Sequence, residues 1–149
     1  MCDAPGNPPE TTGNVNMPLA AITRLRVRSI RYLPEFLLRA VANVLQARRS
    51  AGCLSADVRR EVKLTFWTRT LWQDEQSMRA FMMSGAHRTV MPKILDWCDE
   101  ASVTHWQQDS KHPPDWLAAE TRMRTEGRTS RVRNPSPAHR RGEALPPAV

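Results

Sequence analysis

One histidine of this chain is placed where it could do chemistry. His87 follows Gly85 and shares a predicted helical face with Met91 and Ile94, so apolar side chains are expected to enclose part of its ring. Such a histidine could act as a general acid or base near neutral pH, or as an axial ligand of haem iron. The alternative is a packing or capping histidine that bonds the end of the preceding helix, and the sequence leaves both interpretations open.

Two tryptophans are candidate walls of a ligand pocket. Trp72 ends the longest predicted strand and precedes the helical segment that carries Phe81, so it could lie at a pocket mouth, where aromatic walls suit apolar or planar ligands. Trp106 alternates with His105 on a short predicted strand, so one of the two faces the helices and the other faces a cavity. Core packing is the alternative for these tryptophans.

Three arginines, Arg24, Arg26 and Arg28, project from one face of the first predicted strand. Guanidinium groups hold carboxylates through charge-assisted hydrogen bonds, so Arg26 could orient an anionic ligand if this face lines a cavity. A solvated strand face is the alternative. The spacing of the histidines and cysteines matches no zinc pattern, so no metal site is predicted.

The elements that must position these residues are predicted in the order β-α-β-β-α-β, followed by a last helix. Strands are expected at 21–27, 53–58, 63–72 and 103–107. Helices are expected from Leu33 to about Ser50, from Asp74 to Gly85 with a second stretch up to Cys98, and from Pro113 to Gly127. This order is typical of a ferredoxin-like α+β fold, an antiparallel sheet with helices on one face. The other face then needs a partner, which predicts a homodimer of the dimeric α/β-barrel type.

The predicted domain spans residues 17–127, between two ends that are expected to be disordered. Residues 1–16 are rich in proline, glycine and asparagine, and residues 128–149 are rich in arginine, proline and serine. The net charge of +7 is concentrated in the first half and the tail. Basic ends without a stacking platform or recognition helix do not favour a nucleic-acid partner. No run is apolar enough for a membrane span and the N-terminus is unlike a signal peptide, so a cytoplasmic protein with no membrane partner is expected.

The segments Leu71–Glu75, Gly85–Arg88 and Trp116–Arg122, together with Phe81, Trp97 and Trp106, resemble an uncharacterised bacterial family of dimeric α/β-barrel proteins. The resemblance covers residues 18–139. That family is similar to the antibiotic biosynthesis monooxygenases and, in its tryptophan, histidine and terminal-helix pattern, to the spheroidene monooxygenase group. The resemblance implies sheets that pack to enclose a pocket for an apolar or polycyclic substrate, and in some members for haem. Trp72 and His87 stand in places similar to those of haem-degrading members, but Thr23 stands where those members have asparagine.

The first hypothesis is therefore a monooxygenase-like protein with a small-molecule pocket. His87 is its predicted catalytic residue, Trp72, Trp106 and Phe81 line the pocket, and Arg26 orients an anionic group. The cofactor stays open between haem and none. The alternative is a noncatalytic ligand-binding dimer of the same fold, in which the same residues only shape the cavity.

Overall fold

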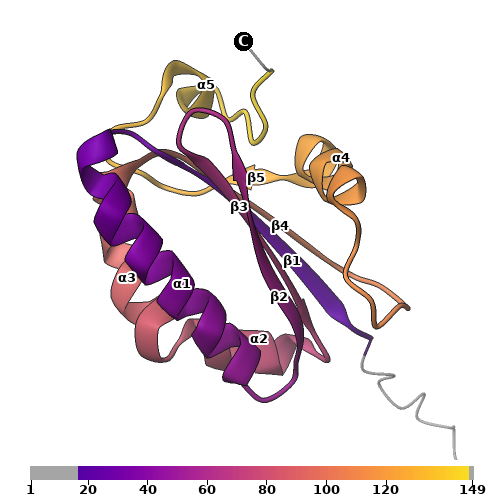
Figure 1. Ribbon diagram of the computed structural model, residues 1–149. Helices are drawn as coiled ribbons and strands as arrows, with labels where there is room; N and C mark the ends of the chain where they lie inside the picture. The colour runs from indigo at the N-terminus through magenta and orange to yellow at the C-terminus, as the bar shows by residue number, and fades with distance from the viewer. Residues whose placement is uncertain (1–16, 148–149) are drawn as a thin grey trace, which may run out of the picture.

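A computed structural model describes residues 17–147, so the predicted disordered segment 1–16 lies outside the described residues. One antiparallel sheet has the strand order β2-β3-β1-β4-β5. Its strands are β1 (Leu19–Val27), β2 (Cys53–Glu61), β3 (Thr65–Trp72), β4 (Cys98–Gln107) and β5 (Arg128–Thr129). The helices are the short 3-10 turn η1 (Ile30–Tyr32), α1 (Leu33–Arg49), α2 (Glu75–Met82), α3 (Gly85–Trp97), α4 (Trp116–Glu126) and α5 (Pro137–Arg140). Helices α1, α2 and α3 lie on one side of the sheet, and α4 and α5 lie on the other (Figure 1). The predicted ferredoxin-like α+β fold is confirmed.

Local sequence signals set the ends of these elements. The Asp74 carboxylate accepts a hydrogen bond of 2.7 Å from the Ser77 backbone N–H and so caps α2. Gly52 turns the chain from α1 into β2 with a φ of +82°, a conformation that side chains rarely adopt. Gly85 was expected to end α2, but it begins α3, and Pro92 lies inside α3 without ending it.

The helix side of the sheet carries two apolar clusters. At one end Phe66 of β3 meets Phe36 of α1, with ring centroids 5.0 Å apart, and Trp97 of α3 joins them. At the other end Trp72 packs against Phe81 of α2. Strand alternation explains this arrangement, because every second residue of β1 and β3 points toward the helices.

The opposite face of the sheet is buried by the chain itself. Ile22 and Trp67 pack against Met123 and Ala119 of α4, and all four side chains have no exposed surface. This is the face on which a second subunit was predicted, and α4 of the same chain covers it; the homodimer itself stays a prediction. The physical reason is that α4 presents a small apolar face that fits the sheet, so the face needs no partner from outside the chain.

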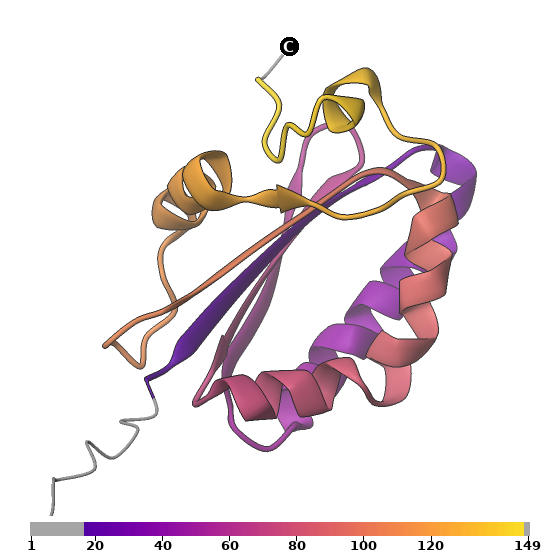
Figure 2. The same ribbon diagram turned by 180° about the vertical axis from the view of Figure 1, so that it is seen from behind.

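Residues 128–147 also differ from their predicted disorder. Strand β5 pairs with β4, Val132 joins the helix-side core, and Ala144 and Leu145 pack with α4 over the sheet. Figure 2 shows this segment running from α4 across the end of the sheet to α5. Its overall composition is poor in apolar residues, but these few reach surfaces that the rest of the domain provides. Within residues 17–147, no helix has the length and apolar character required to cross a membrane.

Candidate functional site

Three of the predicted site residues lie together at one end of the helix side. Trp72 is the last residue of β3, Phe81 lies on α2 and His87 lies in the first turn of α3. The ring centroids of Trp72 and Phe81 are 5.1 Å apart, and those of Phe81 and His87 are 5.0 Å apart. The chain therefore forms a continuous aromatic cluster that ends in an imidazole.

His87 is held by two polar contacts. Its backbone N–H donates to Oε1 of Gln46 on α1 at 3.2 Å, and its Nδ1 lies 3.2 Å from the Met82 carbonyl oxygen. Burial lowers the pKa of His87 below its ordinary value of 6.5, and the contact with the Met82 carbonyl opposes this shift without cancelling it. The imidazole is therefore neutral at pH 7. Since a carbonyl can only accept, Nδ1 carries the proton and Nε2 keeps a free lone pair, as a base requires.

Trp72 does not stand at a pocket mouth. Its side chain has no exposed surface, and its indole Nε1 is buried without a hydrogen-bond partner among the described residues. Core packing, the alternative interpretation from the sequence, describes its surroundings. An unpaired buried N–H costs free energy. The Trp72 indole is therefore a hydrogen-bond donor that the described residues leave unused.

The cavity on the helix side lies between α1, α3 and the sheet, and Phe36 and Phe66 of the other apolar cluster belong to its lining. We call it the helix-side cavity; its volume is about 40 Å³. It is lined by Leu25, Phe36, Arg39, Ala40, Asn43, Val58, Phe66, Thr68, Val90 and Ile94. Oδ1 of Asn43 is buried without a partner among the described residues. The cavity is therefore an apolar space that contains an open hydrogen-bond acceptor.

Asn43 and Thr68 were not among the site residues predicted from the sequence. Asn43 is the polar exception on the inner face of α1, where Phe36, Ala40 and Ala47 are its neighbours. An asparagine within an apolar helical stripe is a signal that the sequence does contain, because a buried amide needs partners. Thr68 gives no comparable signal, since threonine is common in strands.

Arg26 and Trp106 lie on the opposite face of the sheet, away from His87. The Arg26 guanidinium forms two hydrogen bonds with the Asp99 carboxylate, at 2.8 and 2.7 Å, and its Nη2 lies 3.2 Å from Glu100. Trp106 packs near α4, with the Arg122 guanidinium 5.0 Å above its ring. The structure therefore divides the five predicted site residues between two faces of the sheet.

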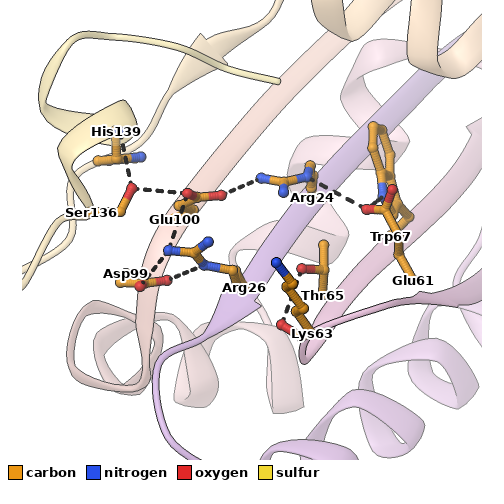
Figure 3. A network of polar contacts seen from close by, with 10 residues as sticks. All are labelled: Arg24, Arg26, Glu61, Lys63, Thr65, Trp67, Asp99, Glu100, Ser136 and His139. Carbon is orange, nitrogen blue, oxygen red and sulfur yellow. Dashed lines mark hydrogen bonds and ion pairs between the residues drawn. The ribbon is translucent and has the colours of Figure 1, made fainter. Parts of the chain in front are cut away.

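Arg26 belongs to a buried group of charges that we call the sheet-face network (Figure 3). Nη1 of Arg24 is 2.7 Å from one oxygen of Glu100, and the Ser136 hydroxyl donates to the other oxygen at 2.9 Å. The indole N–H of Trp67 donates to Glu61 at 2.9 Å. Among the described residues, carboxylates of the same chain therefore pair with both Arg24 and Arg26, the arginine that was predicted to orient an anionic ligand.

The residues on the helix side do not fit haem. His87 offers a lone pair, but its ring is packed against Phe81, and the adjacent cavity is far smaller than the roughly 300 to 1,000 Å³ typical of small-molecule sites. In the part of the chain that the structure describes, no three histidine, cysteine or acidic side chains converge on a metal position.

Solved structures with the same architecture define the class of the fold. A conserved protein from Methanosarcina mazei is 15% identical, with a TM-score of 0.56 over 63% of this chain and 95% of that chain. A Bacteroides thetaiotaomicron protein of unknown function, described as a possible oxidoreductase, is 14% identical, with a TM-score of 0.56 over 62% and 99%. An antibiotic biosynthesis monooxygenase is 16% identical, with a TM-score of 0.55 over 60% and 97%. The fold is thus the ferredoxin-like α+β fold found in antibiotic biosynthesis monooxygenases.

Within this class the chain belongs to the family described as Domain of unknown function (DUF3291), whose model matches residues 34–132. No curated protein matches the sequence. The match covers α1 from its second residue and all of α3, and so includes Asn43, which lines the cavity, and His87. It ends before α5.

Proposed function

We propose that the protein binds a small apolar, aromatic molecule in the helix-side cavity and acts on it as a monooxygenase-like enzyme. The observation that carries this proposal is the buried Oδ1 of Asn43, which has no partner among the described residues and lies in a largely apolar cavity. A ligand with one hydroxyl group on an apolar ring would supply the missing donor and fill the apolar space.

His87 is the proposed proton acceptor. It lies three and seven residues before Val90 and Ile94, which line the cavity, so all three residues share one face of α3. A ligand that extended beyond Val90 by one turn of α3 would reach the neutral imidazole of His87. The fold shared with an antibiotic biosynthesis monooxygenase supports the reaction class.

The volume of the cavity requires that α1 move when a ligand binds. About 40 Å³ holds a few water molecules, whereas a cavity of about 150 Å³ accommodates benzene. Helix α1 contributes only Phe36 and Ala47 as buried residues, although it is 17 residues long. A small outward movement of α1 therefore disturbs little of the core, and polycyclic ligands need a larger movement than a single ring does.

A noncatalytic ligand-binding protein is the second candidate function. The observation that favours it is that the residues lining the cavity include no group that titrates near neutral pH. In this case His87 only anchors α3 to α1 through Gln46.

Ligand binding is tested with phenol and toluene, which have similar shapes but differ in one hydroxyl, with 1-naphthol as the larger probe. Calorimetry on the wild type and on Asn43→Leu should show that the substitution weakens phenol several-fold relative to toluene, because it removes the acceptor. Ala40→Phe, which fills the cavity, should abolish binding of both. An unchanged phenol-to-toluene ratio in Asn43→Leu would argue against the site.

Catalysis is tested separately with any probe that binds. The wild type and His87→Ala are incubated with ligand, oxygen and a reductant, and products are analysed by mass spectrometry. An oxygenated product that is lost in His87→Ala supports the enzyme. Unchanged ligand after long incubation favours the binding protein. Haem is added in a parallel absorbance titration. A saturable Soret shift that His87→Ala removes would contradict the conclusion that the helix-side residues do not fit haem.

A further inference from the structure

The exposed apolar surface of this protein is concentrated on two neighbouring elements. Of the twelve exposed large hydrophobic side chains among residues 17–147, six belong to α1 or β2. We call these six the α1–β2 patch: Leu37, Leu38, Val41, Leu45, Leu54 and Val58. Leu38 is 70% exposed and Val41 is 57% exposed. Clusters of this kind on a folded domain mark interaction surfaces.

The patch lies on one side of the molecule. Leu38, Val41 and Leu45 recur at three- and four-residue spacing and form one stripe along α1. The stripe lies opposite Phe36 and Ala47, which face the sheet, so it points away from the sheet. Helix α3 flanks α1 through the ion pair of Lys93 with Glu35 and the hydrogen bond from Gln46 to Ser84. Comparison of Figures 1 and 2 shows α1 and β2 on one side of the molecule and α3 on the other.

Strand β2 adds an open backbone edge to this patch. It is the first strand of the sheet order and pairs only with β3 among the described residues, so its outer edge has no strand partner. Nε of Arg48 donates to the Ala56 carbonyl oxygen at 2.9 Å, and this largely exposed side chain must release Ala56 when another strand pairs there. An edge strand of nine residues with apolar neighbours is a template for pairing with another strand.

We propose that the occupant of this surface is a second copy of the chain, bound by antiparallel pairing of the two β2 edges around a two-fold axis at Val58. The side chains of β2 are self-complementary in this register. Val58 meets the Val58 of the other copy, and Asp57 lies opposite Arg59 in both directions. Opposite charges directly across two strands stabilise their pairing.

The charges of β2 also fix the register. A two-fold axis one residue earlier would place Asp57 against its own copy, and like charges directly opposite are destabilising. Asp57 and Arg59 already have partners, Arg69 at 2.9 Å and Glu120 at 2.7 Å. Both remain partly exposed, and a carboxylate accepts more than one guanidinium bond.

The two α1 helices complete the interface. Val58 points to the same side of the sheet as α1, because it lines the helix-side cavity with Ala40. The two-fold axis therefore brings both α1 helices to the same side of the joined sheet, where Leu37 and Val41 can contact their copies, because they lie on the flank of α1 from which Arg48 reaches β2. This pairing differs from the face-to-face packing implied by resemblance, which would require α4 to leave the sheet. It does not depend on the proposed function.

Solution mass measured by light scattering or equilibrium sedimentation tests the proposal. The full chain should have twice the mass of one 17.0 kDa chain at micromolar concentrations. Val41→Glu should halve the mass, because Val41 is 57% exposed on the flank of α1 nearest β2 and the charge is placed there without disturbing the core. Leu117→Glu is the matched control, since Leu117 on α4 is 74% exposed and outside the patch; it should leave the dimer intact.

A cysteine pair tests the register. Val58→Cys should form a disulfide-linked dimer on mild oxidation, because residues at the axis of an antiparallel pair lie about 5 Å apart between Cα atoms. Arg60→Cys is exposed on the same strand but should not cross-link, because its two copies lie about 14 Å apart. Both are made in a background with Cys2, Cys53 and Cys98 replaced by serine or alanine, with folding checked by circular dichroism. A monomeric wild type, a dimer that survives Val41→Glu, or equal cross-linking at both positions would overturn the proposal.

Discussion

The substitution Glu100→Gln tests the sheet-face network. Glu100 is 2% exposed and contacts Arg24, Arg26 and Ser136. Removing one partner of a buried ion pair costs about 3 to 5 kcal/mol, because a buried charge is left uncompensated. Glutamine keeps an acceptor for the Ser136 hydroxyl, and Glu61 remains 3.9 Å from Nε of Arg24, so we expect the lower end of this range. The free energy of unfolding should therefore fall by about 3 kcal/mol.

Urea unfolding followed by tryptophan fluorescence measures this change. For a typical urea slope of about 2 kcal/mol/M, the midpoint should fall by about 1.5 M. The matched control is Glu126→Gln, which removes an exposed pair with Arg122 on α4 and should cost less than about 0.5 kcal/mol. If Glu100→Gln unfolds at the same urea concentration as the wild type, Glu100 does not compensate the buried charges of Arg24 and Arg26.

Three further predictions follow from burial. Met123→Ala should lower the free energy of unfolding by about 3 kcal/mol, because Met123 is fully buried against Ile22 and Trp67; an unchanged urea midpoint would mean that α4 does not cover the sheet. Because burial lowers the pKa of His87 in the folded state, the unfolded chain binds more protons below pH 6.5. The contribution of His87 to the free energy of unfolding is therefore fully present above pH 6.5 and is lost as the pH falls toward the folded-state pKa. His87→Gln should flatten this part of the curve, and an identical slope in the variant would refute the assignment. Burial raises the pKa of Cys98 to about 12, so iodoacetamide should label it only after unfolding, and peptide mass spectrometry of the native protein that found labelled Cys98 would contradict this.

The strand pattern of the sequence predicted most of the sheet. Strand β1 was expected from residue 21 and begins at Leu19. The prediction was close because the alternation of apolar and basic residues matches the two faces of the strand. Strand β4 was expected only from Val103, but it begins at Cys98, directly after α3. Its first residues were missed because Asp99 and Glu100 do not look like buried strand residues. Glu100 is buried and Asp99 is partly buried, and both form ion pairs with arginines of β1, Glu100 with Arg24 and Asp99 with Arg26.

The candidate site was predicted only in part. Sequence order places Trp72, Phe81 and His87 close together, because a strand end leads directly into two short helices, and the structure brings their rings into contact. The sequence could not show that Arg26 and Trp106 lie across the sheet from them. A strand residue has two choices of face, and the choice depends on what packs against each face.

By itself, the sequence determined the order of strands and helices and hence the ferredoxin-like fold, because hydrophobic period and capping residues act over a few neighbouring positions. The tertiary structure alone decided what covers the second face of the sheet. Residues 128–147 contain too few apolar side chains to predict order locally, yet Val132, Ala144 and Ser136 each reach a partner that the folded domain supplies. Such contacts join residues far apart in the chain, so no local pattern encodes them.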